Sequence, residues 1–99
     1  MMGSRVVYYR GMRFEVIPEV YEPAEDTLLL ADNLDVRKEE RVLDLGTGCG
    51  LLAILAAKLG GMVIATDVSP KAIECAEINA RTNHAVSYTH LTLPTICSV

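Results

Sequence analysis

The apolar residues of this chain occur in short blocks whose spacing changes from that of strands to that of helices. Two strand-like blocks within residues 5–17 flank Arg10 and Gly11, a pair that suits a tight turn, and this predicts a β-hairpin. Gly60 and Gly61 are expected to end a later helix in the left-handed conformation that glycine adopts readily. Beyond the hairpin the spacing predicts a helix, a strand, a helix, a strand and a helix, at about residues 23–34, 42–45, 51–59, 62–66 and 70–82.

The repeated order of strand and helix indicates an α/β fold. Two strands that are each followed by a helix are expected to lie parallel in one sheet, joined by a right-handed crossover. Ligands of such sheets bind at the carboxyl ends of the strands. With 99 residues, of which 51% are hydrophobic, the chain suits one small domain with a core. We therefore predict a Rossmann-like parallel sheet with flanking helices, preceded by the hairpin and the first helix.

The turn after the first strand of this sheet contains alternating glycines, Gly46, Gly48 and Gly50, with Asp44 just before them. Glycines in this position let the backbone pass close to a ligand. The dinucleotide pattern Gly-x-Gly-x-x-Gly would need glycine in place of Leu51, and a pyrophosphate would gain nothing from a nearby carboxylate. S-adenosylmethionine instead carries a sulfonium and an ammonium group, with which a carboxylate interacts favourably. The loop therefore predicts an S-adenosylmethionine site with Asp44 at its positive groups.

A second carboxylate, Asp67, ends the next strand and is predicted to hold the ribose of the same cofactor. It lies 21 residues after Gly46, close to the ~20 residues that separate a glycine loop from a ribose-binding acid. Its two oxygens can accept hydrogen bonds from two ribose hydroxyls. The alternative role of Asp67, capping the next helix, is better filled by Ser69, which stands directly before Pro70.

The residues before the first strand of the sheet point to a family. Segment 20–30, Val-Tyr-Glu-Pro-Ala-Glu-Asp-Thr-Leu-Leu-Leu, together with the glycine loop, resembles the HemK-related protein glutamine methyltransferases, especially their archaeal and eukaryotic branch. The resemblance covers about residues 5–83. It implies the N-terminal half of a class I S-adenosylmethionine-dependent methyltransferase fold, with Thr27 at the methionine end of the cofactor. From its position alone, Thr27 could equally be an ordinary residue of a capped helix. The predicted cofactor-binding residues are Thr27, Asp44, Gly46, Thr47, Gly48, Gly50 and Asp67.

The resemblance also implies an activity, which is methylation of a glutamine side-chain amide in a peptide chain release factor. A small activating subunit is a candidate partner. In this family an Asn-Pro-Pro-Tyr motif after the fourth strand holds the acceptor amide, and the chain contains no such motif. Asn79 and Asn83 are not expected to replace it, because they lie on or just after a helix without adjoining prolines. No catalytic residue is therefore predicted here.

Other functions remain in competition with this one. The first alternative is a class I methyltransferase that modifies RNA or a small molecule, and the sequence after the fourth strand would distinguish it. The second alternative is a nicotinamide-dependent oxidoreductase, which would bind NAD in place of S-adenosylmethionine. A third is a cofactor-binding module without catalysis.

Residues 86–99 break the pattern of the preceding chain. They contain no Asp, Glu, Lys or Arg, and they can be read either as a third strand or as foreign sequence. The decapeptide 86–95 is what results from translating an adaptor used in transposase-based sequencing libraries, which favours the foreign origin. We therefore expect a partial methyltransferase domain at 1–85 and a tail at 86–99 that is not native. With two strands in its sheet, such a fragment is expected to fold poorly and to be inactive.

Composition adds weaker constraints. The formal net charge of −4 argues only weakly against contact with nucleic acid, which stays among the candidate substrates. Arg5, Arg10 and Arg13 form the one local basic excess and are expected to be a solvated hairpin face. No membrane span or signal peptide is visible, so the expected compartment is the cytoplasm. The three cysteines lack disulfide or metal-ligand spacing, so no metal is expected, and Cys49 is expected to matter through its backbone.

Overall fold

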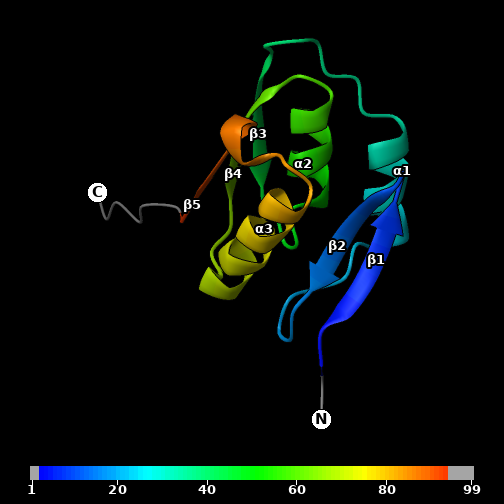
Figure 1. Cartoon of the computed structure of the whole chain (residues 1–99), viewed down its shortest axis with the longest axis vertical. Helices are drawn as coiled ribbons and strands as arrows, with labels where there is room; N and C mark the ends of the chain where they lie inside the picture. The colour runs from blue at the N-terminus through cyan, green and yellow to red at the C-terminus, as the bar shows by residue number, and fades with distance from the viewer. Residues whose placement is uncertain (1–2, 94–99) are drawn as a thin grey trace.

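The computed structural model describes residues 3–93, and its first unit is the hairpin (Figure 1). β1 (Arg5–Tyr9) pairs antiparallel with β2 (Met12–Val16). Arg10 and Gly11 both have positive φ, 48° and 78°, as a two-residue type I′ turn requires. This turn matches the twist of the flanking strands, and the predicted hairpin is confirmed.

The elements after the hairpin follow in the predicted order. They are α1 (Glu25–Asp32), β3 (Arg41–Leu45), α2 (Leu51–Lys58), β4 (Met62–Thr66), α3 (Pro70–Thr82), a short 3-10 turn η1 (Val86–Tyr88) and β5 (Thr89–Thr92). The bounds of β3, α2, β4 and α3 lie within one residue of the prediction. α1 is shorter than the helix predicted at 23–34, and Ala24 before it is extended and offers no side-chain cap. At its end the Asn33 amide donates to the carbonyl of Leu29 at 2.8 Å.

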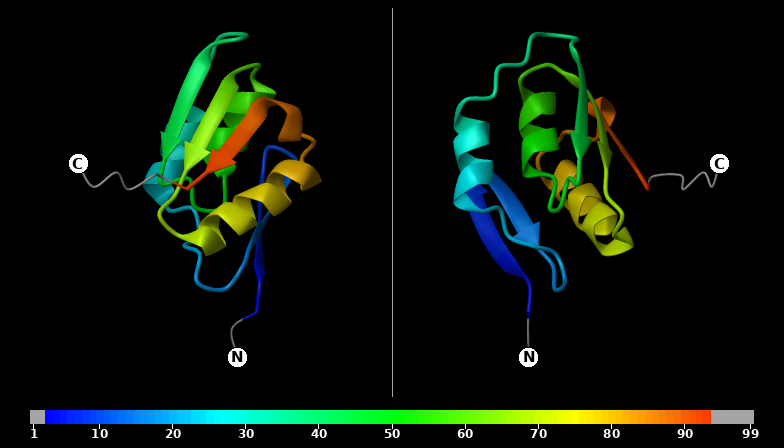
Figure 2. Two further views of the ribbon diagram at one scale, coloured as in Figure 1. Left: turned by 90° about the vertical axis from the view of Figure 1, so that its left-hand side faces the viewer. Right: turned by 180° about the vertical axis from the view of Figure 1, so that it is seen from behind.

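β3, β4 and β5 form a parallel sheet in that order, which confirms the predicted α/β class. α2 and α3 pack on one face of the sheet, where Val63 and Ala65 are buried. The opposite face carries Leu43, Met62 and Ile64, all exposed. In the left view of Figure 2 the strands lie in front of the helices, and no element among residues 3–93 covers the near face. We call this surface the open face.

The sheet differs from the expectation of two strands. Residues 89–92 form β5, whose Thr89 is aligned with Val63 and whose Thr92 is aligned with Thr66 of β4. The third-strand interpretation of this segment, which we ranked second, therefore describes its structure, and the two-strand expectation is wrong. The adaptor origin of 86–99 concerns the encoding DNA, which a fold does not test, and it stays a prediction. Residues 94–99 lie outside the described residues.

The hairpin docks on the helix layer through β2. Phe14 and Val16 are almost completely buried there, with 0% and 1% of their surface exposed. Next to them, the amide of Asn83, which follows α3, accepts from the N–H of Arg13 at 3.1 Å and donates to its carbonyl at 2.8 Å. Asn83 thus replaces a neighbouring strand on the free edge of β2. This structural role agrees with the expectation that Asn83 does not substitute for the acceptor motif.

Candidate functional site

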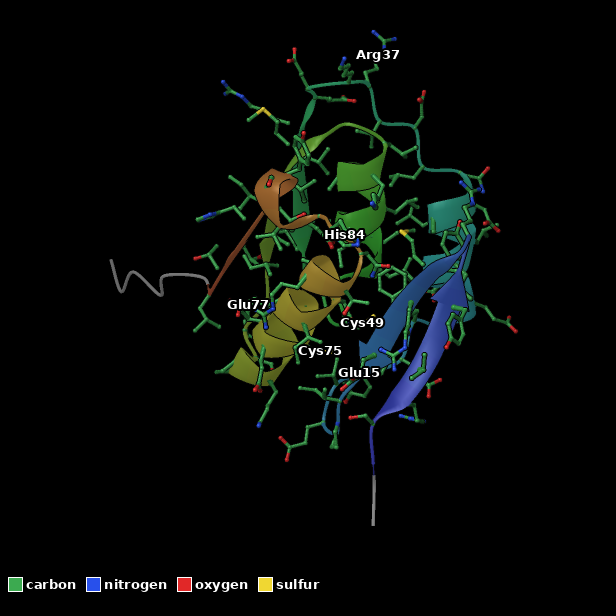
Figure 3. The ribbon with its side chains drawn as sticks, viewed as in Figure 1. Glu15, Arg37, Cys49, Cys75, Glu77 and His84 are labelled. Atoms are coloured by element: carbon green, nitrogen blue, oxygen red, sulfur yellow. The ribbon has the colours of Figure 1, made fainter. Side chains whose placement is uncertain are left out.

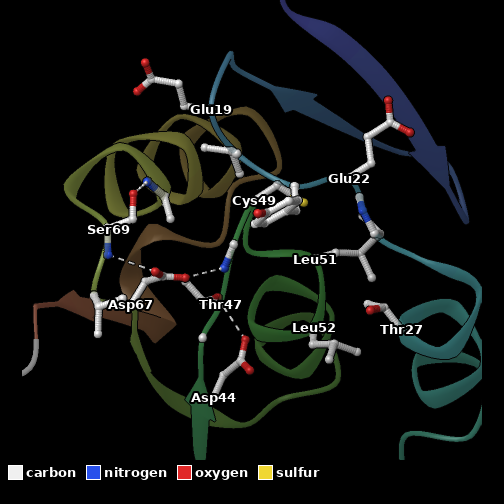
Figure 4. Close-up of a pocket in the computed structure, with 17 residues that line it drawn as sticks. Glu19, Glu22, Thr27, Asp44, Thr47, Cys49, Leu51, Leu52, Asp67 and Ser69 are labelled. Carbon is white, nitrogen blue, oxygen red and sulfur yellow. Dashed lines mark hydrogen bonds between the residues drawn. The ribbon is translucent and has the colours of Figure 1, made fainter.

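A pocket of about 350 Å³ opens at the carboxyl ends of β3 and β4, where the sheet topology predicts a ligand (Figure 4). Its volume lies within the ~300–1,000 Å³ typical of small-molecule sites. The walls come from the segment after β2, the first turn of α1, the glycine loop with the start of α2, and the loop between β4 and α3. Six predicted cofactor residues line it, namely Thr27, Asp44, Gly46, Thr47, Gly48 and Asp67.

The first two glycines of the loop are required by backbone conformation. Gly46 and Gly48 have φ of 72° and 57°, and a Cβ added to either would meet no other atom of the protein within 4 Å. The N–H groups of Gly46 and Thr47 both donate to the carbonyl of Thr66 at 2.9 Å, which fastens the loop to the end of β4. The loop therefore presents a fixed backbone surface, free of side chains at two positions, to the pocket.

Gly50 lies apart from the other predicted cofactor residues. It does not line the pocket. A Cβ at this position would lie 3.0 Å from the Cβ of Ala76 and 3.3 Å from Cδ1 of Ile54, and its φ is 89°. Gly50 therefore allows α2 to begin in close contact with α3, and the structure does not bring it to the expected cofactor site.

Asp44 stands at the pocket with one oxygen already engaged. The Thr47 hydroxyl donates to its Oδ2 at 2.8 Å, which fixes the orientation of the carboxyl group. Burial raises the pKa of Asp44, a shift that the Thr47 hydrogen bond opposes and the charge of Asp67 increases. A half-buried carboxylate with a raised pKa gains most from a positively charged neighbour.

Asp67 is oriented by two backbone N–H groups. Gly48 donates to its Oδ2 at 3.0 Å, and Ser69 donates to its Oδ1 at 2.9 Å (Figure 4). A carboxylate has about four lone-pair positions, so each oxygen can accept a further hydrogen bond from a ligand hydroxyl. The hydroxyl of Ser69 accepts from the N–H of Ala72 at 3.3 Å, so Ser69 caps α3 as predicted.

The pocket wall opposite the glycine loop includes residues that the sequence did not single out. Glu19 has a left-handed φ of 76°, and Tyr21 is 92% exposed beside the opening. Glu22 forms an ion pair of 2.7 Å with Arg5 of β1, which ties this wall to the hairpin. Val68, beside Asp67, also lines the pocket and is exposed. Glu19 directly precedes segment 20–30 and Val68 directly follows Asp67. This adjacency is the sequence signal that could have identified both as pocket residues.

The charged side chains among the described residues that line the pocket are all acidic. Glu19, Glu22, Asp44 and Asp67 contribute carboxylates, whereas none of the described residues that line the pocket is Lys, Arg or His. Phosphate groups bind where N–H groups and positive charge converge. This wall composition favours a ligand with positive charge over a pyrophosphate.

The remaining polar groups give no sign of other chemistry. Among residues 3–93 no group of three or more His, Cys, Asp or Glu could hold a metal ion, and no helix there is long and apolar enough to cross a membrane. Cys49 is buried, and burial raises the pKa of its thiol to about 11, which makes it a poor nucleophile. The basic hairpin residues pair with acids, Arg10 with Asp32 and Arg13 with Glu15, both at 3.8 Å.

Comparison with known proteins assigns the family. A sequence profile described as ribosomal protein L11 methyltransferase (PrmA) matches residues 24–97. A Methanocaldococcus jannaschii protein, provisionally named protein N5-glutamine methyltransferase, is 40% identical over 80 residues, which cover 80% of this chain and 41% of that protein. Methyltransferase HEMK2 of Homo sapiens is 40% identical over 73 residues, which cover 66% of this chain and 34% of that protein. The chain thus spans less than half the length of these relatives.

Solved structures show the same fold at low sequence identity. TYW2 of M. jannaschii, in complex with AdoMet, has a TM-score of 0.82 at 17% identity, covering 100% of this chain and 47% of that one. A tRNA (uracil-54, C5)-methyltransferase of Pyrococcus abyssi, in complex with S-adenosyl-L-homocysteine, has a TM-score of 0.77 at 20% identity, covering 95% of this chain and 24% of that one. Their arrangement of strands and helices is the one found here.

The family profile, the two relatives and the fold agree with the resemblance read from segment 20–30 and the glycine loop. The profile covers most of the chain and includes all seven predicted cofactor residues. The chain belongs to the ribosomal protein L11 methyltransferase (PrmA) family, within the class I S-adenosylmethionine-dependent methyltransferases.

Proposed function

We propose that this chain is the cofactor-binding half of a protein methyltransferase and that its pocket binds S-adenosylmethionine. The observation that carries the proposal is the pair of oriented carboxylates, Asp44 and Asp67, on either side of the glycine loop in a pocket whose described wall has no basic residue. A cationic ligand with free ribose hydroxyls fits this wall better than a dinucleotide does.

The main predicted residues have distinct tasks in this proposal. Asp44, held by Thr47, accepts from the ammonium group and lowers the electrostatic energy of the positive charges. Asp67, held by two backbone N–H groups, accepts from the ribose hydroxyls. Gly48 lets the backbone approach the ligand, and Thr27 contacts the methionine end, a role that rests on the family resemblance. S-adenosylmethionine supplies, when bound, a methyl group on a sulfonium.

For the acceptor we propose a glutamine side-chain amide of a peptide chain release factor, methylated in the cytoplasm with the help of a small activating subunit. Two observations support this choice. Segment 20–30 resembles the HemK-related enzymes, and the M. jannaschii relative carries the name of a protein N5-glutamine methyltransferase. The Asn-Pro-Pro-Tyr motif of those enzymes is not in this sequence, so the chain by itself is expected to hold cofactor without transferring the methyl group.

Ribosomal protein L11 is the second candidate acceptor, because the profile that matches residues 24–97 carries its name. A methyl-transfer assay on the full-length M. jannaschii relative would separate the two. Release factor and L11 would be offered in parallel with labelled S-adenosylmethionine, and the modified residue would be located by mass spectrometry. We expect methylglutamine in the release factor. Label in L11 alone would favour the second candidate, and label in neither protein would contradict the protein-substrate proposal.

A further inference from the structure

Asn79 connects α3 to β2 and to the glycine loop, and the proposed function gives it no role. It lies on α3, is 0% exposed, and uses its whole side-chain amide. Its Oδ1 accepts from the N–H of Glu15 at 2.7 Å, and its Nδ2 donates to the carbonyls of Glu15 and Cys49, both at 2.8 Å. In Figure 3, Glu15 of β2 and Cys49 of the glycine loop are labelled beside α3, the helix that carries Asn79.

A second asparagine, Asn83, bonds to β2 one helical turn after Asn79. Asn83 pairs with Arg13 by the same two kinds of hydrogen bond that Asn79 makes with Glu15. The spacings agree, because four helical residues rise about 6 Å and two strand residues about 6.6 Å. The two amides therefore act together as a substitute strand on the free edge of β2. Only Asn79 has an additional bond to the glycine loop.

The carbonyl of Cys49 is the point where Asn79 reaches the pocket. Its two neighbours are Gly48, whose N–H orients Asp67, and Gly50, which begins α2. A buried carbonyl without a hydrogen-bond partner is unfavourable, so this bond constrains the Cys49–Gly50 peptide of the loop. The position of Asn79 needs one hydrogen-bond acceptor and two donors, and an uncharged side-chain amide supplies all three.

We infer that Asn79 is a positioning residue for the cofactor pocket, which couples docking of the hairpin to the conformation of the glycine loop. The inference rests on the proposed function, since the ligand whose binding it affects is S-adenosylmethionine. A ligand that fixes the conformation of the loop is expected to strengthen the hydrogen bonds between Asn79 and Glu15. Because coupling between two sites is reciprocal, displacing the hairpin from Asn79 is expected to weaken ligand binding. Asn83 holds the hairpin and also donates to the backbone carbonyl of Asn79 at 2.9 Å, but among the described residues its side chain makes no hydrogen bond to the loop.

The first test uses the unaltered 99-residue chain and hydrogen exchange followed by NMR. The backbone N–H groups of Glu15 and Arg13 are matched probes, because each donates to an asparagine Oδ1 on the same edge of β2. Saturating S-adenosylmethionine is expected to slow exchange at Glu15 at least about threefold more than at Arg13, since only the first is linked to the loop. Equal slowing at the two sites would overturn the inference.

The second test compares Asn79→Asp with Asn83→Asp. Both substitutions remove amide donors from α3 and are expected to lower the melting temperature. Titration calorimetry below both melting temperatures should show S-adenosylmethionine affinity at least about tenfold weaker in the Asn79 variant than in the Asn83 variant. Equal affinities in the two variants would contradict a positioning role.

The two tests also separate the inference from the proposed function. If the Asn79 variant does not fold, the exchange measurement on the unaltered chain decides the matter. If the unaltered chain binds S-adenosylmethionine but either of the two measured differences is absent, the inference alone fails. If the folded unaltered chain does not bind it, the proposed function fails and the inference with it.

Discussion

The pocket and the open face are both left uncovered by residues 3–93, but they expose different chemistry. In the pocket, Asp67 is held by two N–H groups and Asp44 by a hydroxyl. The open face presents aliphatic side chains, such as Leu43 at 62% and Ile64 at 49% exposure. Polar groups that are already oriented indicate a site prepared for a small ligand, whereas an aliphatic face is one that parallel sheets normally cover. Exposure by itself therefore does not identify a functional surface.

The largest effect is expected at Asp67. Replacing it with Ala removes the acceptor proposed for the ribose hydroxyls and the group that orients Gly48. We expect a loss of about 2–3 kcal/mol in S-adenosylmethionine binding, roughly a hundredfold. The control is Glu74→Ala, which removes the same charge from an exposed acid of α3 that does not line the pocket. Calorimetry that gives the same affinity for both variants would contradict the ribose role.

An effect of similar size is expected at Gly50, but it concerns stability. Gly50→Ala introduces a strained φ and a contact of 3.0 Å with Ala76. The expected loss in the free energy of unfolding is about 2–3 kcal/mol, measured by urea denaturation. Gly11→Ala is the matched control, because its φ is 78° but the added Cβ meets nothing within 4 Å. Equal losses for the two variants would show that Gly50 is not needed for packing.

The next effect is the pH dependence that Asp44 contributes. Burial raises the pKa of this carboxyl group above its usual value of 3.8, so the folded chain holds the proton more tightly than the unfolded chain does. Its contribution to stability is therefore present below the unfolded pKa and is lost as pH rises through the raised folded pKa. Ligand binding needs the carboxylate, so affinity should rise as the pH increases from the usual carboxyl value of 3.8 through the raised folded pKa.

The Asp44→Asn variant tests this assignment. The part of the pH dependence that belongs to Asp44 should disappear in the variant, while its affinity at neutral pH falls. Calorimetric titrations of both proteins across the same pH series provide the comparison. An unchanged slope in the variant would mean that another group is responsible.

The smallest effect is expected on the open face. Leu43→Lys should change the free energy of unfolding by less than about 0.5 kcal/mol and leave ligand affinity unchanged, because the side chain is exposed and does not line the pocket. It should, however, reduce association of the chain, which we attribute to contact between aliphatic faces. Sedimentation velocity at several concentrations would measure this. A chain that is already monomeric at all of them would contradict our view of this face.

Much of the fold could be predicted from local sequence signals. The Arg10-Gly11 turn, the end of α2 before Gly60 and the Ser69 cap of α3 each depend on a few neighbouring residues, and each lies where predicted. The start of α1 was less accurate because Pro23 allows a helix to begin but does not fix where. For β5 the adaptor match of segment 86–95 favours foreign sequence over a strand, and the pairing with β4 that forms the strand depends on residues distant in the sequence.

In the candidate site, too, features set by local sequence could be predicted and features set by packing between distant residues could not. Asp44 and Asp67 could be predicted because each ends a strand, and parallel strands bring their carboxyl ends together. The spacing of the three glycines could not show that Gly50 faces Ala76, since this depends on how α3 packs on α2. The role of Asn79 was missed for a similar reason. Its partners, Glu15 and Cys49, lie 64 and 30 residues away in the chain.

The most direct test of the central claim is a calorimetric titration of the 99-residue chain with S-adenosylmethionine and, separately, with NAD. The account predicts saturable binding of S-adenosylmethionine that is roughly a hundredfold weaker in Asp67→Ala. It predicts no detectable binding of NAD, because the carboxylates of the pocket oppose a pyrophosphate. Binding of NAD by a chain that does not bind S-adenosylmethionine would contradict it.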